Sequence, residues 1–131
     1  MRLRVVAGAV IEDGRVLCAR RGPAQRHPGL WELPGGKVES GESDAQALQR
    51  ELEEELRVSV HVAEYIGTSA HDYPDLKIDL VAYVCQITRG QPEPVEHAEL
   101  RWVALSELEA LSWAPADQPL IALLSASAAC T

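Results

Sequence analysis

Short apolar runs separated by glycine, proline and polar residues set the pattern of this chain. Six runs rich in valine, leucine and isoleucine cover residues 3–11, 15–20, 30–33, 58–68, 76–88 and 100–103. Apolar runs bounded by turn residues are typical of β-strands. Asp13-Gly14 predicts a two-residue hairpin between the first two runs, and residues 71–75 predict the turn of a second hairpin. The sequence therefore predicts a substantial β-sheet.

Residues 43–58 follow a different period. Their apolar positions recur every three or four residues, at Ala45, Leu48, Leu52 and Leu56. That spacing forms a narrow apolar stripe along one side of an α-helix, which must pack on a core. Ser43 and Gln46 have the spacing of a capping box, so we expect the helix to begin directly after Ser43.

The C-terminal part of the chain predicts two shorter helices. Ser106 and Glu109 have the spacing of a second capping box, which indicates a helix over residues 106–111. Asp117 is placed to act as the N-cap of a final helix over residues 118–127. Together with the strands and the long helix, these elements indicate a fold of the α/β (α+β) class.

Three glutamates lie beside the apolar stripe of the long helix. Glu51, Glu54 and Glu55 stand at positions i, i+3 and i+4, so they share one flank and repel each other by a few tenths of a kcal/mol per pair. A solvated acidic face is the simplest interpretation of such a helix considered by itself. The alternative is a cation site, because hard divalent ions such as Mg²⁺ take carboxylate oxygens as ligands.

Composition narrows the function classes. The chain has 131 residues, enough for one domain (1–131), and a net charge of −8. That charge argues against nucleic-acid and acidic-membrane partners, since no basic patch offsets it. We see no signal peptide and no run long enough to span a membrane. Cys18, Cys85 and Cys130 are odd in number and widely spaced, which predicts reduced thiols in a cytoplasmic protein.

The glycines before the long helix favour the cation site. The fixed positions of a longer pattern are Gly36, Glu42, Arg50, Glu51, Glu54, Glu55 and Val58, spread over 23 residues. This pattern resembles the signature of the Nudix hydrolases, which cleave a nucleoside diphosphate linked to another group. One position departs from it, because Arg57 stands where the family has a glycine that ends the helix in a left-handed conformation. A residue other than glycine costs about 1–2 kcal/mol there, which leaves the end of the helix open.

The resemblance extends to the MutT branch of the family and implies a fold and an activity. It implies a Nudix fold, an α/β/α sandwich with a mixed β-sheet. It also implies Mg²⁺-dependent hydrolysis of a nucleoside triphosphate to the monophosphate and pyrophosphate, with Mn²⁺ as a possible substitute. We expect a nucleotide-pool sanitising enzyme related to DNA repair, acting on an oxidised dGTP or a cytidine triphosphate. The expected partner is the small-molecule nucleotide alone, bound by a monomer or weak dimer.

The resemblance also assigns roles to residues of this chain. The implied metal ligands are the Gly35 carbonyl, Glu51, Glu54, Glu55 and Glu96. The implied catalytic residues are Arg50, Glu51, Glu54 and Glu96, in which Arg50 orients Glu51 by a charge-assisted hydrogen bond and either Glu51 or Glu96 takes the proton of the attacking water. The implied substrate-binding residues are Arg21, Leu33, Lys37 and Asp117.

Asp117 matches the position from which MutT-type enzymes read the base. An ionised aspartate only accepts hydrogen bonds, so it would favour a base edge rich in donors, such as the amine of cytosine or the N–H groups of 8-oxoguanine. Two other functions stay open on the same scaffold. One is a pyrophosphatase for ADP-ribose or dinucleoside polyphosphates, and the other is a nucleotide-binding module without catalytic activity, against which the intact Glu51, Glu54 and Glu55 argue.

Overall fold

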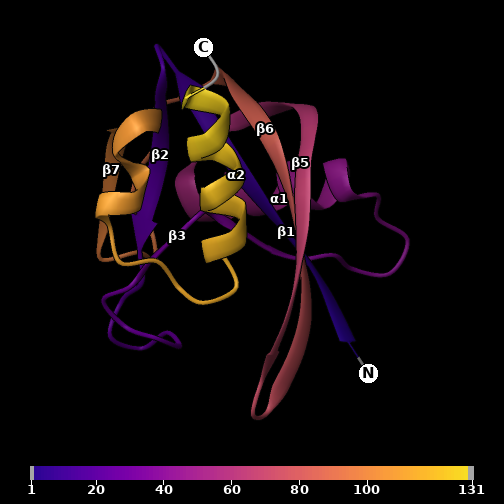
Figure 1. Cartoon of the computed structure of the whole chain (residues 1–131). Helices are drawn as coiled ribbons and strands as arrows, with labels where there is room; N and C mark the ends of the chain where they lie inside the picture. Colours follow the sequence, from indigo (N-terminus) through magenta and orange to yellow (C-terminus); the bar gives the residue numbers. More distant parts are fainter. Residues whose placement is uncertain (1, 130–131) are drawn as a thin grey trace.

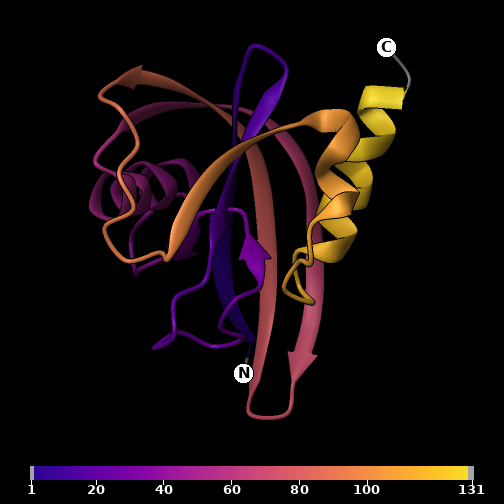
Figure 2. The ribbon, with the colours of Figure 1, turned by 90° about the vertical axis from the view of Figure 1, so that its left-hand side faces the viewer.

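The computed structural model describes residues 2–129 and shows a mixed sheet between two helices (Figure 1). The strands are β1 (Arg2–Glu12), β2 (Arg15–Arg20), β3 (Trp31–Glu32), β4 (Gly35–Lys37), β5 (Ser59–Tyr73), β6 (Leu76–Arg89) and β7 (Glu99–Ala104). The helices are α1 (Asp44–Leu56), the 3₁₀-helix η1 (Leu105–Ala110) and α2 (Gln118–Ala129). Figure 2 shows α1 and α2 on opposite sides of the strands, so the expected α/β/α sandwich is confirmed.

Strand β1 lies at the centre of the seven-stranded sheet. It runs parallel to β6 from the pair Arg2 and Lys77 to the pair Val10 and Cys85, and antiparallel to β4 and the start of β2. Strand β5 pairs antiparallel with β6, and β2 carries β3 and β7. Because both faces of β1 are covered, its sequence is a continuous apolar run and does not alternate between apolar and polar residues.

The side chains of the sheet form two cores. On one face, Leu48, Leu52 and Leu56 of α1 pack with Val6, Val10 and Leu17. On the other face, Leu120, Ile121 and Leu124 of α2 pack with Ala7, Ala9 and Leu80. Successive residues of β1 therefore alternate between the two cores, which fixes the register of the central strand. The thiols of Cys18 and Cys85 are buried and free, while Cys130 lies outside the described residues.

Both ends of α1 are well defined. The Ser43 side chain accepts from the Gln46 backbone N–H and the Gln46 side chain accepts from the Ser43 N–H, so the capping box is confirmed. At the other end, Arg57 adopts the left-handed conformation with φ 62° and ψ 34°, and its N–H donates to the Glu53 carbonyl at 3.0 Å. The helix thus ends where a family glycine would end it, despite the cost of the side chain.

Three local expectations were wrong, and a fourth was wrong in part. Strand β5 continues through residues 71–73, because these residues pair with β6, so the turn is limited to Pro74-Asp75. Residues 35–37 form a short strand on β1 rather than part of a loop. The element at 106–111 is a 3₁₀-helix that begins after Ala104 without a side-chain cap. Asp117 occupies the N-cap position of α2, since its carbonyl accepts from Leu120 and Ile121, but its carboxylate binds the Leu33 N–H at 2.9 Å and does not cap the helix.

Within the part of the chain that the structure describes, no helix combines the length and the apolar character that a membrane crossing requires. The two termini of the described chain lie at opposite ends of the sandwich in Figure 1.

Candidate active site

Two glycines bring the backbone of β4 against its neighbours. A Cβ atom on Gly35 would lie 1.9 Å from the Val6 carbonyl oxygen, so any side chain there would collide with β1. A Cβ atom on Gly36 would lie 2.2 Å from Cδ of Glu51. The glycine pair is therefore required by close packing, and it allows the Glu51 carboxylate to lie directly against the β4 backbone.

Arg50 ties the segment after β4 to α1. Its guanidinium donates to both carboxylate oxygens of Glu42, at 2.7 and 2.9 Å, and to the Lys37 carbonyl at 3.0 Å. It also donates to Glu51 Oε1 at 2.9 Å, which is the contact expected from the sequence. The Arg50 hydrogen bonds, together with one from the Glu39 backbone, lower the pKa of Glu42 to about 2. Glu42 thus stays ionised and braces this segment.

Glu51 and Glu55 face β4 and are partly buried. Burial raises the pKa of Glu51, although the Arg50 guanidinium opposes the shift. Burial, followed by the charges of Glu32, Glu51 and Glu96, raises the pKa of Glu55 to about 8. Glu55 Oε2 is buried without a hydrogen-bond partner. Burial therefore disfavours the charged form of both carboxylates, and only Glu51 has an arginine beside it.

The predicted metal ligands do not all lie in the same group. Glu51, Glu55 and Gly35 lie together, and the charge of Glu96 reaches Glu55 from the loop between β6 and β7. Glu54 lies at the edge of this group, with 61% of its side chain exposed and a 3.5 Å contact to Arg50. The expected flank is thus split into an inner pair of carboxylates and an outer one.

Across residues 2–129, no group of three or more acidic, histidine or cysteine side chains is arranged so that it could hold a metal ion. The chemistry of the donors nevertheless fits a hard divalent cation, because they are carboxylate oxygens and one of them, Glu55 Oε2, is buried without a hydrogen-bond partner. Mg²⁺ in particular is usually bound by one or two carboxylates, with water and substrate phosphates completing its shell.

Glu32 is a member of the acidic group that sequence reasoning missed. It lies on β3, and its charge is the largest electrostatic contribution to the raised pKa of Glu55. One Glu32 oxygen is paired with Arg21 and the other lies 2.7 Å from Nε2 of the buried His97. The sequence offered only one signal, namely an acidic residue inside the short apolar run before the glycine pair.

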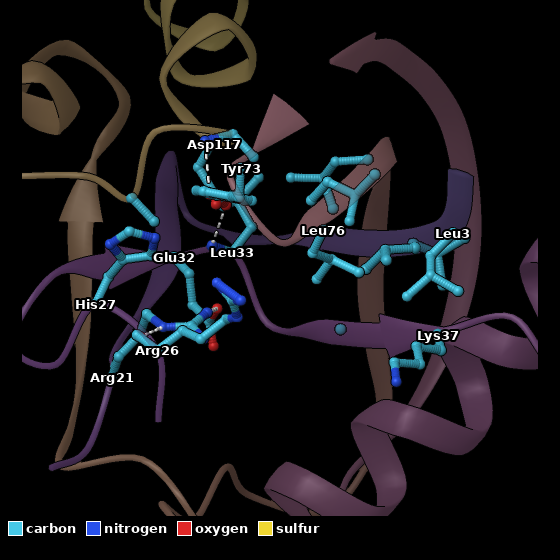
Figure 3. A pocket seen from close by; sticks show the side chains of 17 residues that line it. Leu3, Arg21, Arg26, His27, Glu32, Leu33, Lys37, Tyr73, Leu76 and Asp117 are labelled. Carbon is cyan, nitrogen blue, oxygen red and sulfur yellow. Dashed lines mark hydrogen bonds and ion pairs between the residues drawn. The ribbon is translucent and has the colours of Figure 1, made fainter. Parts of the chain in front are cut away.

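A pocket opens beside the carboxylates, because Glu32 and Gly35 line it and are also neighbours of Glu55. Figure 3 shows Asp117, Tyr73 and Leu33 at one end of this pocket and Lys37 at the other. All four predicted substrate residues line it: Arg21, Leu33, Lys37 and Asp117. Arg21 does so with its guanidinium already paired to Glu32, while the Lys37 side chain is exposed at the rim.

Asp117 is buried at the base of the pocket. Burial raises its pKa to about 8, and the hydrogen bond from the Leu33 N–H only partly opposes this shift. At neutral pH the carboxyl is therefore largely protonated, so it can donate as well as accept a hydrogen bond. The raised pKa argues against the expected ionised, acceptor-only aspartate.

Three further residues of the pocket were not anticipated as site residues. Tyr73 accepts a hydrogen bond from the Ala116 N–H at 3.3 Å through its hydroxyl, and its ring lies 5.0 Å from that of His27. Arg26 lies over the same ring and pairs with Asp75 beyond it. These contacts tie the loop after β2 to the tip of the β5–β6 hairpin. No local sequence pattern signals them, because they join segments far apart in the chain.

The fold and the site define the class of protein. Residues 2–124 match the NUDIX domain family, so the chain belongs to this family and is a Nudix hydrolase. Enzymes of this family generally use a divalent metal ion.

Relatives of known activity lie close in sequence. The chain is 39% identical over 119 residues to the CTP pyrophosphohydrolase of Escherichia coli (strain K12), covering 91% of this chain and 88% of the relative. It is 30% identical over 124 residues to the 8-oxo-dGTP diphosphatase of the same strain, covering 94% of this chain and 96% of the relative. The solution structure of the E. coli ORF135 protein has a TM-score of 0.86 and 37% identity, covering 99% of this chain and 94% of that one. The names of these relatives are consistent with a nucleotide as the substrate.

Proposed function

We propose that the protein hydrolyses nucleoside triphosphates to the monophosphate and pyrophosphate with Mg²⁺, and so removes unwanted nucleotides from the pool. The observation that carries this proposal is the border between two features: a group of partly buried carboxylates and a pocket with the buried Asp117 at its base. A base in the pocket would direct its phosphates past Gly35 toward the carboxylates. The names of the relatives support a nucleoside triphosphate as substrate.

Each carboxylate has a proposed role. Glu51, Glu54, Glu55, Glu96 and the Gly35 carbonyl would hold the cation. When bound, a divalent cation neutralises polyphosphate charge and lowers the pKa of water. Arg50 keeps Glu51 in one orientation through its 2.9 Å hydrogen bond, and Glu42 in turn holds Arg50.

Glu51 and Glu96 are both candidates for taking the proton of the attacking water. Glu51 is fixed between Arg50 and Gly36, whereas Glu96 is exposed on the loop between β6 and β7. The pH dependence of kcat in Glu51→Gln and Glu96→Gln shows which of the two is the general base. Only loss of the general base removes the fall in kcat at acidic pH, where that group becomes protonated.

Asp117, Leu33 and Arg21 are the proposed contacts for the base, with Lys37 near the phosphates. The largely protonated Asp117 presents both a donor and an acceptor, so it can pair with a base edge that offers one of each. Cytosine and oxidised guanine both remain substrates that this group can bind. We propose that one Nudix domain spans residues 1–131, and the cytoplasmic location and the monomeric or weakly dimeric state stay predictions.

A panel of substrates tests the proposal. The protein is incubated with Mg²⁺ and each of CTP, dCTP, dGTP, 8-oxo-dGTP, ADP-ribose and a dinucleoside polyphosphate, and products are separated by chromatography. We expect a monophosphate and pyrophosphate from one or more triphosphates, and Glu55→Gln, which loses the charge but keeps the shape, serves as the inactive control. Release of inorganic phosphate alone, or cleavage of ADP-ribose alone, would contradict the proposal.

The same reaction in ¹⁸O-labelled water locates the bond that breaks. Attack at the β-phosphorus, the MutT pattern, places the label in pyrophosphate, whereas attack at the α-phosphorus places it in the monophosphate. We expect label in pyrophosphate. Label in the monophosphate would show that the phosphates bind in a different register along the carboxylates.

A further inference from the structure

His97, in the loop between β6 and β7, is the only buried histidine among the described residues. Its side chain has no exposed surface, and its Nε2 lies 2.7 Å from Glu32 Oε2. Its Nδ1 is buried and has no hydrogen-bond partner. A buried polar atom without a partner costs stability. A histidine kept at this cost, with its other ring nitrogen on Glu32, is therefore a candidate for a role in the neighbouring site.

The loop that contains His97 is fixed at its two ends. The Glu93 N–H donates to the Leu56 carbonyl at 2.9 Å, and the Val95 N–H approaches the Glu55 carbonyl at 3.3 Å, so the first half of the loop is held by the end of α1. The Ala98 N–H donates to the Arg20 carbonyl at 2.9 Å, at the end of β2. Between these points, the His97 side chain is the contact that reaches the interior.

Glu96 lies between two fixed neighbours. On one side Val95 is held by the carbonyl of Glu55, and on the other side His97 is held by Glu32. The backbone hydrogen bond from Val95, the residue before Glu96, to the Glu55 carbonyl places this part of the loop beside Glu55. Without the His97 contact, only the backbone hydrogen bonds of Val95 and Ala98 would hold this part of the loop, and Glu96 would be less tightly fixed beside Glu55.

The same contact restrains Glu32. Arg21 holds one of its oxygens and His97 the other, so the Glu32 carboxylate has a single orientation on the border between the pocket and the acidic group. With one partner removed, the carboxylate can rotate about its remaining bond. His97 thus acts on two acidic residues, one on β3 and one in its own loop.

We propose that His97 is a positioning residue for the cation site, which fixes Glu96 beside Glu55 and holds Glu32 in one orientation. This inference rests on the proposed function, since Glu96 is a cation ligand only there. It differs from a purely structural role in what it predicts. A structural histidine would change stability alone, whereas a positioning histidine changes the affinity for the cation and acts through Glu96.

Mn²⁺ binding to the metal-free protein, followed by the electron paramagnetic resonance signal of the free ion, measures that affinity without turnover. We compare the wild type, His97→Leu, Glu96→Gln and the double variant. We expect each single variant to bind Mn²⁺ about 10-fold more weakly, as is usual for residues that support metal ligands. The double variant should also lose about 10-fold rather than about 100-fold, because both changes remove the same ligand. In turnover, His97→Leu should lower kcat and leave the KM for nucleotide unchanged.

Matched variants separate position from folding. The side-chain amide of His97→Gln can still donate to Glu32, so it should restore most of the Mn²⁺ affinity. Ser69→Ala removes another buried polar side chain, in β5, and should bind Mn²⁺ as the wild type does. If circular dichroism shows that His97→Leu does not fold, His97→Asn replaces it, because that amide keeps a polar group but does not reach Glu32.

Two results would overturn the inference. One is a folded His97→Leu or His97→Asn variant with wild-type Mn²⁺ affinity, and the other is a double variant whose loss is the product of the two single losses. A wild-type protein that binds no Mn²⁺ and cleaves no nucleoside triphosphate would instead overturn the proposed function.

Discussion

Replacing Glu55 by glutamine should make the metal-free protein more stable while it destroys activity. The Glu55 carboxylate is partly buried, one of its oxygens has no hydrogen-bond partner, and its charge is repelled by Glu32, Glu51 and Glu96. Glutamine keeps the shape of the side chain and removes the charge. The stability gained should depend on pH, because a protonated glutamate is already neutral.

The magnitude follows from the pKa of Glu55, which is raised from 4.5 to about 8 in the folded protein. Below pH 4.5 the carboxyl is neutral in both the folded and unfolded states, so glutamine should gain nothing there. As the pH rises to 8, the unfolded state ionises first and the wild type loses stability. The shift of about 3.5 pKa units corresponds to at most about 5 kcal/mol. Relaxation and water penetration reduce this penalty, and we expect about 2 kcal/mol.

Urea unfolding in the presence of a chelator measures the effect. The free energy of unfolding is compared between the wild type and Glu55→Gln at pH 5 and pH 8.5. Other titrating groups contribute equally to both proteins, so the difference isolates Glu55. Glu53→Gln removes an equal charge from an exposed position of the same helix and serves as the control.

A difference between Glu55→Gln and wild type that stays constant with pH would contradict this prediction. An equal gain in stability at pH 8.5 for Glu53→Gln and Glu55→Gln would also contradict it. The first result would show that Glu55 is ionised at little cost in the folded protein. The second would show that the gain comes from the net charge of the helix and not from the buried site.

Three other substitutions test separate parts of the account. Asp117→Asn should change the ratio of kcat/KM between cytidine and 8-oxoguanine triphosphates by about 10-fold or more, since one hydrogen-bonding pattern is replaced by another. An unchanged ranking of substrates would show that Asp117 does not contact the base. Arg57→Gly should stabilise the protein by about 0.5–1 kcal/mol in thermal unfolding, because glycine adopts the left-handed conformation at the helix end without the steric cost. A gain of the same size in Arg57→Ala would show that relief of this steric cost is not the reason. Arg50→Lys should lower kcat by about 10-fold or more, because a lysine cannot bind Glu42 and Glu51 together as the guanidinium does. Turnover equal to that of the wild type would show that the orientation of Glu51 does not depend on Arg50.

The local features of the catalytic helix could be predicted from sequence because they depend on spacing alone. The capping box at Ser43, the apolar stripe of α1 and the glutamate flank all follow from the helical period. Even the end of the helix at Arg57 agrees with the family pattern, although the residue does not.

Contacts between distant segments could not be predicted in this way. The pair of His97 with Glu32 joins residues 65 positions apart, and the bond from Leu33 to Asp117 joins residues 84 positions apart. Burial then decides the charge of Asp117, which the sequence alone does not give. The extension of β5 through residues 71–73 likewise depends on pairing with β6 rather than on local preference.

The inner flank of α1, formed by Glu51 and Glu55, is proposed to bind a divalent cation and, through it, the phosphates of a nucleotide. A crystal structure of the protein with Mn²⁺ and a non-hydrolysable nucleoside triphosphate, with the ion located from its anomalous scattering, tests this directly. We expect an anomalous peak in contact with Glu51, Glu55 and the Gly35 carbonyl, beside the phosphates of a nucleotide whose base lies against Asp117. A nucleotide bound elsewhere, with no peak at this flank, would contradict it.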